Sequence, residues 1–165
     1  MSGVHEAPVG ATVEWYTPPT LFLLLMRGAA DPWFDLDPAG SPESACSFVP
    51  ARRIIRLPDD GLAHEWRGHV WLNPPYGPAA RPFVDRMIAH GDGLLLLASR
   101  TETKVYQRAI AAADATCLLR DRVWFRRGDG HHGRSSFGST LFAFGHWAVE
   151  RLAEADLGTI VRAAA

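Results

Sequence analysis

The sequence is poor in cysteine and in long apolar runs, and each shortage excludes a class of protein. Cys46 and Cys117 are the two cysteines, and no CxxC or HExxH pattern occurs, so we expect free thiols, no disulfide framework and no metal site. The longest apolar stretches, 21–26 and 94–98, are far too short to span a bilayer. The N-terminus carries neither the basic nor the apolar segment of an export signal. These absences predict a cytoplasmic protein with no membrane partner.

The chain also lacks an excess of charge of one sign. Its 165 residues carry a net charge of −1, so the global basic field typical of a tight nucleic-acid binder is missing. The charge is nevertheless uneven, because five arginines and two aspartates lie between residues 117 and 137. On charge alone, the simpler interpretation of this segment is a solvated, arginine-rich hairpin.

Alternating strand-like and helix-like segments predict an α/β protein whose sheet is mostly parallel with an antiparallel hairpin at its edge. Apolar runs predict strands at 33–37, 53–57, 69–72, 93–99, 115–125 and 137–144. Helices are predicted at 18–27, 79–90, 102–113 and 146–164. A chain of this length fits one compact domain. We therefore expect residues 1–13 to form a flexible N-terminal arm and residues 14–165 a single domain, without a separate target-recognition domain.

The tetrapeptide Asn73-Pro74-Pro75-Tyr76 follows a predicted strand and precedes a predicted helix, which is where open α/β sheets bind ligands. Proline has no N–H and a nearly fixed φ, so the carbonyls of Asn73 and Pro74 are presented outward in a defined direction. The Asn73 amide adds a side-chain acceptor beside them. Two converging acceptors suit an –NH2 donor, and Tyr76 offers a flat face for stacking. The motif predicts a pocket for the amino group of a nucleobase.

Pro-Pro-Tyr also occurs in turns and in polyproline ligands of small recognition domains. Those ligands usually lie in disordered, proline-rich tails, whereas this motif lies in mid-chain between an apolar strand and a helix. Its context favours the binding pocket.

A second group of polar residues precedes this motif in the chain. Asp35 and Asp37 are two residues apart in a predicted strand, so both carboxylates are expected on one face, where they would suit an ammonium group or a ribose diol. Thr17 and Pro18 are expected to begin a helix, whose free N–H groups suit a carboxylate. The alternatives are an ordinary helix cap for Thr17 and a polar strand end for the aspartates. An ammonium site beside a carboxylate site is what the amino-acid end of S-adenosyl-methionine requires.

In this order, the motifs resemble those of the phage-type DNA N-6-adenine methyltransferases over roughly residues 14–145. The opening Trp-x-Thr-Pro element of that family is similar to residues 15–18, and its Phe-Asp-x-Asp element to residues 34–37. The similarity continues through Asn73-Pro74-Pro75-Tyr76, an Arg-Thr segment at 100–101, a strand at 119–125 and a small-residue turn at 136–139. Asp121 stands where the family usually has glycine.

This resemblance implies a Rossmann-like methyltransferase fold that binds S-adenosyl-methionine and methylates the 6-amino group of adenine in DNA. Thr17 and Pro18 would line the methionine carboxylate, and Asp35 and Asp37, with Pro38, would hold the amino group or the ribose. The residues expected to form the target-base pocket are Asn73, Pro74, Pro75 and Tyr76. The candidates for DNA contact are Arg100, Arg122, Arg126 and Arg127. Asp59 and Asp60 are loop candidates for the adenosine, with no pattern to prefer either.

Three alternatives stay open at this point. Adenine in RNA and the side-chain amide of a protein glutamine also present an –NH2 group to such a pocket. A non-catalytic nucleic-acid-binding relative could retain the fold without the reaction, although the intact motif at 73–76 argues against it.

Overall fold

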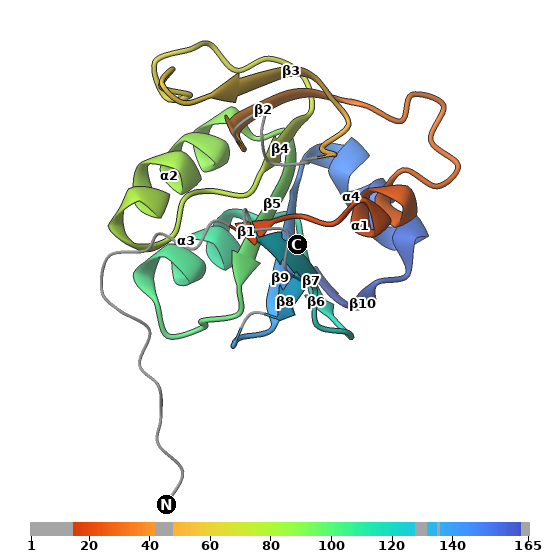
Figure 1. The fold of residues 1–165 in the computed structure, drawn as a ribbon. Helices are drawn as coiled ribbons and strands as arrows, with labels where there is room; N and C mark the ends of the chain where they lie inside the picture. The colour runs from red at the N-terminus through yellow and green to blue at the C-terminus, as the bar shows by residue number, and fades with distance from the viewer. Residues whose placement is uncertain (1–14, 42–47, 128–131, 135, 163–165) are drawn as a thin grey trace, which may run out of the picture.

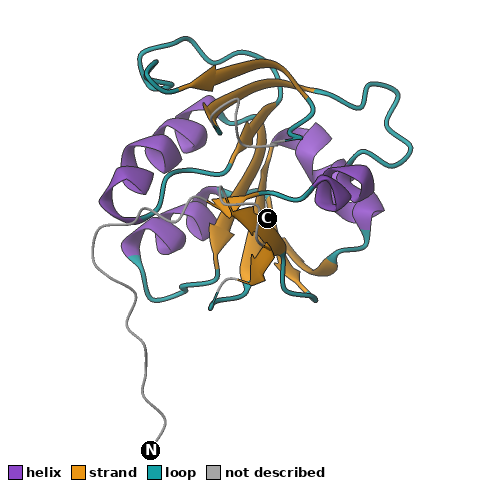
Figure 2. Cartoon of the chain, in the orientation of Figure 1, coloured by secondary structure: helices purple, strands orange, loops and turns teal. Residues whose placement is uncertain are grey.

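A central sheet with helices on both of its faces forms the body of the molecule (Figures 1 and 2). The computed structural model describes residues 15–41, 48–127, 132–134 and 136–162, so the predicted arm at 1–13 lies outside the described residues. The described strands are β1 Trp15–Tyr16, β2 Phe34–Gly40, β3 Ala51–Arg56, β4 Val70–Leu72, β5 Gly93–Ala98, β6 Ala115–Leu119, β7 Trp124–Arg127, β8 His132–Arg134, β9 Ser139–Phe144 and β10 Gly158–Arg162. The described helices are α1 Pro19–Leu25, the 3-10 turn η1 Gly77–Ala79, α2 Ala80–His90, α3 Lys104–Ala112 and α4 Gly145–Ala155.

The main sheet has seven strands in the order β10-β6-β9-β5-β4-β2-β3. β3, β2, β4 and β5 are parallel neighbours, whereas β9 is antiparallel to both β5 and β6, and β10 is antiparallel to β6. β6 therefore runs in the same direction as the parallel strands, and only β9 and β10 oppose them among the described strands. This arrangement confirms an α/β domain with a mostly parallel, mixed sheet. The predicted pairing of the segments 115–125 and 137–144 is present as β6 and β9. The pair is not at the edge of the sheet as predicted, because β10 pairs with β6 on its outer side.

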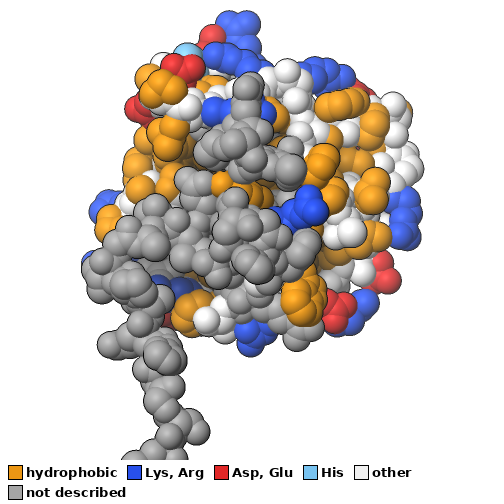
Figure 3. All heavy atoms as spheres, in the orientation of Figure 1, with side chains coloured by type: hydrophobic (Ala, Val, Ile, Leu, Met, Phe, Trp, Pro, Cys, Tyr) orange, Lys and Arg blue, Asp and Glu red, His pale blue; other side chains and the backbone are white. Residues whose placement is uncertain are grey.

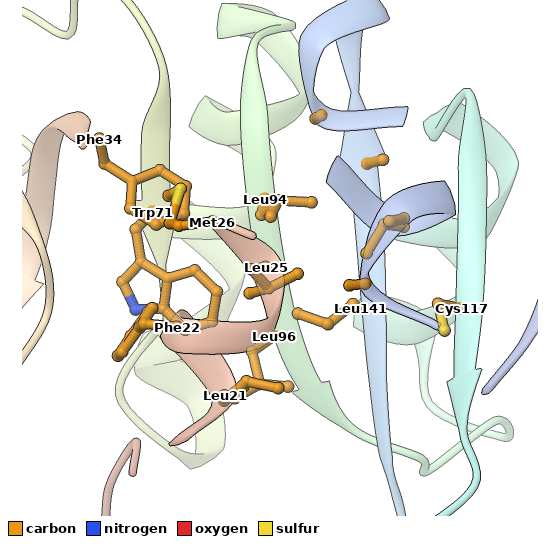
Figure 4. Packing of buried hydrophobic residues seen from close by; sticks show 14 of the residues in the cluster. Leu21, Phe22, Leu25, Met26, Phe34, Trp71, Leu94, Leu96, Cys117 and Leu141 are labelled. Atoms are coloured by element: carbon orange, nitrogen blue, oxygen red, sulfur yellow. The ribbon is translucent and has the colours of Figure 1, made fainter. Parts of the chain in front are cut away.

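Two apolar layers cover the sheet, because side chains alternate between its faces. Leu94 and Leu96 of β5 pack with α1 and α4, while Leu95 between them packs with α2 and α3. Figure 4 shows Phe22 and Leu25 of α1 directed at the first of these layers. The continuous apolar run of β5 is thus explained by burial on both faces, which is typical of a central strand in an α/β sheet.

The predicted helix at 146–164 is wrong in its second half. The helix α4 ends at Ala155, and Asp156 takes the left-handed conformation with φ 47°. The chain then forms β10, where the β-branched residues Thr159, Ile160 and Val161 pair with β6. A β-branched run favours a strand, and the pairing with an exposed edge strand outweighs the helical pattern of the sequence.

The predicted strand at 115–125 is divided in the structure. β6 ends at Leu119, and β7 begins at Trp124 in a separate sheet of order β1-β7-β8. The amide of Arg120 donates to the carbonyl of Leu157, which ends the ladder of β6.

None of the helices in the described ranges is both long enough and apolar enough to cross a membrane.

Candidate functional site

A cavity of about 650 Å³ opens beside the carboxyl ends of β2 and β4. The chain leaves β2 towards β3 on one side and leaves β4 towards β5 on the other, so the strand order reverses between these two neighbours. Such a reversal opens a crevice at which α/β sheets bind ligands. The cavity lies within the range of about 300–1,000 Å³ typical of small-molecule sites. The residues lining it are Tyr16, Thr17, Asp37, Pro38, Ala39, Gly40, Ser41, Val49, Ile55, Leu57, Pro58, Asp59, Asp60, Gly61, Trp71, Asn73, Pro74, Pro75, Tyr76, Ala79 and Phe83.

The four residues Asn73-Pro74-Pro75-Tyr76 all line this cavity, as the sequence predicts. They connect β4 to η1, and Pro74 is buried while Pro75 is exposed. Tyr76 is 52% exposed, so one part of its ring is available to a ligand. Burial of the other part raises the pKa of its phenol above the ordinary 10.0, so the side chain stays neutral well above pH 7. The motif therefore offers fixed acceptors and an uncharged aromatic face.

Thr17 lines the cavity but does not cap a helix. The helix α1 begins at Pro19, its N-cap is Pro18 in an extended conformation, and no side chain caps it. Instead, the Thr17 hydroxyl accepts a hydrogen bond of 3.4 Å from Nδ2 of Asn73. Pro18 is absent from the cavity wall. The expected carboxylate site at this helix start has fewer donors than an ordinary helix start, because Pro18 and Pro19 have no N–H and the Leu21 amide donates to the Pro18 carbonyl.

Asp37 is a buried carboxylate on the wall of the cavity, with 3% of its surface exposed. Desolvation raises its pKa from the ordinary 3.8 to about 7, and a hydrogen bond from the Ala39 amide and the charge of Arg56 oppose that rise. The neighbouring Pro38 also lines the cavity. A carboxylate in this setting is costly to ionise until a cation or a hydrogen-bond donor approaches it.

Asp35 does not share this site, contrary to the expectation from its spacing. Its carboxylate accepts hydrogen bonds from the His69 amide at 2.8 Å and from Arg52 at 3.2 Å, and it lies outside the cavity wall. The amides of Asp35 and Leu36 both point at the His69 carbonyl, at 2.8 and 3.5 Å. The regular alternation of the strand is thus interrupted between the two aspartates, and the rule that residues i and i+2 share a face does not hold here.

One wall of the cavity comes from a loop of which the sequence identifies only Asp59 and Asp60 as candidates. The loop follows β3, and Leu57, Pro58, Asp59, Asp60 and Gly61 line the cavity. Gly61 packs so closely on Pro38 that an added Cβ would lie 1.8 Å from the Pro38 carbonyl oxygen.

Arg86 of α2 holds this loop through contacts with the residues that follow it. Its guanidinium donates to the carbonyls of Leu62 and His64, both at 2.7 Å, and lies over the Trp66 ring. Trp66 in turn donates to the Gly61 carbonyl at 2.9 Å. The only sequence signal for this wall is its pair of acidic residues, Asp59 and Asp60. The contacts of Arg86 depend on tertiary structure.

The four candidate arginines lie outside the cavity wall. Arg126 is paired with Tyr16 across β1 and β7, and its guanidinium lies 6.0 Å from the Phe48 ring. Arg122 donates to the Ser136 carbonyl, and Arg100 lies over Phe137 and forms an ion pair with Glu102. Arg127 pairs with Trp15 through the backbone of β7. Because Tyr16 and Val49 line the cavity, Arg126 and Phe48 adjoin its rim.

Basic side chains are scattered over the face seen in Figure 3, with hydrophobic side chains between them. In the described part of the chain, no group of three or more His, Cys, Asp or Glu side chains could hold a metal ion.

Comparisons with models of protein families, with curated proteins and with solved structures find no match for this chain.

Proposed function

We propose that this protein is a Rossmann-like methyltransferase that transfers a methyl group from S-adenosyl-methionine to the 6-amino group of adenine in DNA. The observation that carries the proposal is that Asp37 and the motif Asn73-Pro74-Pro75-Tyr76 line the same cavity. These two motifs are 36 residues apart in the sequence, and neighbouring parallel strands bring them together. The order in which the motifs resemble the phage-type adenine methyltransferases supports the same conclusion.

The residues around Asp37 fit S-adenosyl-methionine. A carboxylate that is 3% exposed at the wall of a cavity of about 650 Å³ suits the amino group or the ribose hydroxyls of this cofactor. Asp59 and Asp60 supply further acceptors from the loop after β3. When bound, S-adenosyl-methionine supplies a methyl group that is already activated by its sulfonium.

The motif at 73–76 supplies what the acceptor amine needs. The amino nitrogen of adenine is a poor nucleophile, because its lone pair is delocalised into the ring. Acceptance of both its hydrogens, by the Asn73 side chain and the Pro74 carbonyl, draws the nitrogen towards tetrahedral geometry and increases its electron density. Fixed acceptors of this kind stabilise the transition state without reorganisation. The protein otherwise contributes alignment of the two reacting groups.

Adenine is inaccessible within a duplex, so the base must be flipped out or presented in a single strand. The half-exposed Tyr76 ring is suited to stack on the extruded base, a contact worth about 1–3 kcal/mol. Arg126 adjoins the rim of the cavity, which makes it the candidate for contact with the phosphates on either side of the extruded base.

The test of the proposal is methyl transfer from radiolabelled S-adenosyl-methionine to DNA, followed by digestion to nucleosides and mass spectrometry of the modified base. We expect Asn73→Ala and Tyr76→Ala each to abolish most of the transfer while cofactor affinity stays nearly intact. The reason is that both residues address the acceptor base and not the donor. Full activity in Asn73→Ala would contradict the mechanism.

A reciprocal variant completes this experiment. Asp37→Ala should weaken cofactor binding, measured by calorimetry, more than it weakens DNA binding. The same transfer assay with RNA and with a glutamine-containing protein in place of DNA tests the other substrates that carry an –NH2 group. Cofactor binding without transfer to any of them would favour a non-catalytic relative.

A further inference from the structure

We infer that Arg56 is a positioning residue for the cofactor, which acts from the end of β3 and favours the ionised form of the Asp37 carboxyl group. The inference rests on the proposed function, because it concerns the side chain on which cofactor binding depends. Arg56 itself lies outside the cavity wall, so its effect on the cofactor passes through Asp37 and not through direct contact.

A β-bulge interrupts the pairing of β2 with β3 beside Asp37. Asp37 is opposite Ile54 and Gly40 is opposite Arg56, so β2 has two residues between these pairs where β3 has one. Bulges of this kind redirect side chains and are frequent beside active sites. Beyond the bulge, the backbone of Gly40 lies so close to β3 that an added Cβ would overlap the side chain of Ile54. The end of β2 is therefore held in contact with the end of β3.

A hydrogen bond fixes the Arg56 guanidinium against this bulged segment. Its Nε donates to the carbonyl of Ser41 at 2.9 Å, at a partly buried position. Hydrogen bonds from a charged donor are stronger than those between neutral groups. Asp37, Ser41 and the three residues between them all line the cavity. The guanidinium thus lies behind the part of the wall that carries the buried carboxyl group.

The charge of Arg56 acts on Asp37 from this position. Asp37 is 3% exposed, and desolvation raises its pKa to about 7, against the hydrogen bond from Ala39 and the charge of Arg56, which both lower it. None of the described residues on the cavity wall is basic. The other titratable groups on this wall are Tyr16, Asp59, Asp60 and Tyr76.

The remaining cations of β3 are engaged away from Asp37. Arg52 donates to Asp31, and Arg53 lies 3.0 Å from Nδ1 of His64. On the other side of β2, the strand β4 has no titratable side chain. Arg56 is therefore the basic group that makes ionisation of the buried carboxyl group less costly when the cofactor approaches.

The test is the affinity for S-adenosyl-methionine, measured by calorimetry between pH 6 and pH 9 for the wild type and for Arg56→Gln. Glutamine keeps a donor for the Ser41 carbonyl but removes the charge. We expect the Kd of Arg56→Gln to exceed that of the wild type by about 3- to 10-fold at pH 6 and to approach it at pH 9, where Asp37 is ionised in both proteins. The ratio of the two Kd values cancels the titration of the cofactor's own amino group.

Three further variants control this comparison. Arg56→Lys keeps the charge and should follow the pH profile of the wild type. Arg53→Gln is the matched control on the same strand, because it removes an exposed charge that contacts His64. Arg56→Met is a second neutral variant that keeps most of the aliphatic stem. Thermal unfolding shows which variants are folded at the temperature of the measurement.

A second measurement requires no cofactor. The 13C resonance of the Asp37 carboxyl group is assigned in labelled protein by its loss in Asp37→Asn. We expect it to titrate at a higher pH in Arg56→Gln than in the wild type, and at the wild-type pH in Arg53→Gln.

The outcomes separate this inference from the proposed function. A wild type that binds the cofactor and methylates DNA, with a ratio of Kd values that is the same at every pH, would overturn the inference alone. An Asp37 titration that does not move in Arg56→Gln would also overturn it. A wild type that does not bind S-adenosyl-methionine would overturn the proposed function, and the inference with it.

Discussion

At Asp37, folding stability and ligand binding make opposite demands on one side chain. Its carboxyl group is buried at the cavity wall, where desolvation raises its pKa to about 7. A buried carboxylate of this kind stabilises a bound cation or donor strongly, but it destabilises the ligand-free fold when it ionises. The pH and the bound ligand together determine how much the ionisation of Asp37 lowers the free energy of unfolding.

We expect Asp37→Asn to stabilise the ligand-free protein at pH 8 and to lose this advantage near pH 4. The folded pKa of about 7 lies above the ordinary 3.8, so the folded state holds the proton more tightly. The contribution of Asp37 to the free energy of unfolding therefore falls as the pH rises from about 4 to about 7. A shift of this size corresponds to at most about 4 kcal/mol.

Urea unfolding of the wild type and of Asp37→Asn between pH 4 and pH 8 checks this prediction. Asp59→Asn is the matched control, because it removes an exposed carboxylate from the same cavity. A difference between wild type and Asp37→Asn that stays constant with pH would contradict the raised pKa.

At the scale of elements, the loop after β3 depends on α2. The Arg86 side chain joins them through two carbonyl contacts and the Trp66 ring. Because α2 follows directly on η1 and the motif at 73–76, the same helix supports both that motif and the cavity wall formed by residues 57–61.

Arg86→Ala should loosen this loop. We expect faster amide hydrogen exchange over residues 59–66 and a loss of about 1–3 kcal/mol in the free energy of unfolding, since two charge-assisted hydrogen bonds disappear. Hydrogen exchange read by mass spectrometry provides the measurement. Arg81→Ala is the control on the same helix, where the side chain is exposed and pairs with Asp85 at 3.7 Å. Equal exchange in both variants would show that Arg86 does not secure the loop.

The terminal strand β10 allows a second prediction at this scale. The direction of the change in stability distinguishes the observed strand from the helix that the sequence predicts for this segment. An added Cβ at Gly158 would lie 2.1 Å from the Leu118 carbonyl oxygen, so Gly158→Ala should destabilise the protein by about 1–3 kcal/mol. In a helix the same change would stabilise it, by about 0.5–1 kcal/mol. Denaturant unfolding decides between the two, and a gain in stability would rule out the strand.

At the scale of the whole molecule, the charge is nearly balanced and much of it is paired. Arg52, Arg67, Arg81, Arg108, Arg120 and Arg151 form ion pairs with acidic side chains. With a net charge of −1, the protein would attract nucleic acid through a few local cations and not through a general field. On the proposed function, we associate this attraction with Arg126, which adjoins the rim of the cavity, and with Arg122.

Replacement of Arg122 and Arg126 by glutamine should flatten the salt dependence of DNA binding. An arginine that no longer neutralises a phosphate lowers the slope of log K against log[salt] by about 0.7–0.9. Fluorescence anisotropy with a labelled oligonucleotide at several salt concentrations measures that slope. Arg108→Gln is the control, because Arg108 lies on α3 and pairs with Asp85 at 2.7 Å. A slope unchanged in the double variant would place the DNA elsewhere.

Local sequence determined the elements and the acceptor motif. The apolar run of β5 predicted a buried strand, and the proline-rich segment after β4 predicted a pocket at the end of β4. Both the buried strand and the pocket are present in the structure. These features are predictable because burial, proline geometry and side-chain periodicity act over a few residues. The same local rules failed at 156–162, where pairing with β6 outweighs helical periodicity.

Only the tertiary structure decided which polar side chains meet. The spacing of Asp35 and Asp37 predicted a shared site, but the contacts of Asp35 with His69 and Arg52 hold it apart. The contact of Thr17 with Asn73 and the hold of Arg86 on the cavity loop join segments that are 56 and 22–24 residues apart. No local pattern encodes such pairs, because they join segments that only the tertiary fold brings together. The sequence alone predicted an acceptor for an amino group at 73–76, and the fold determined which side chains lie beside that motif.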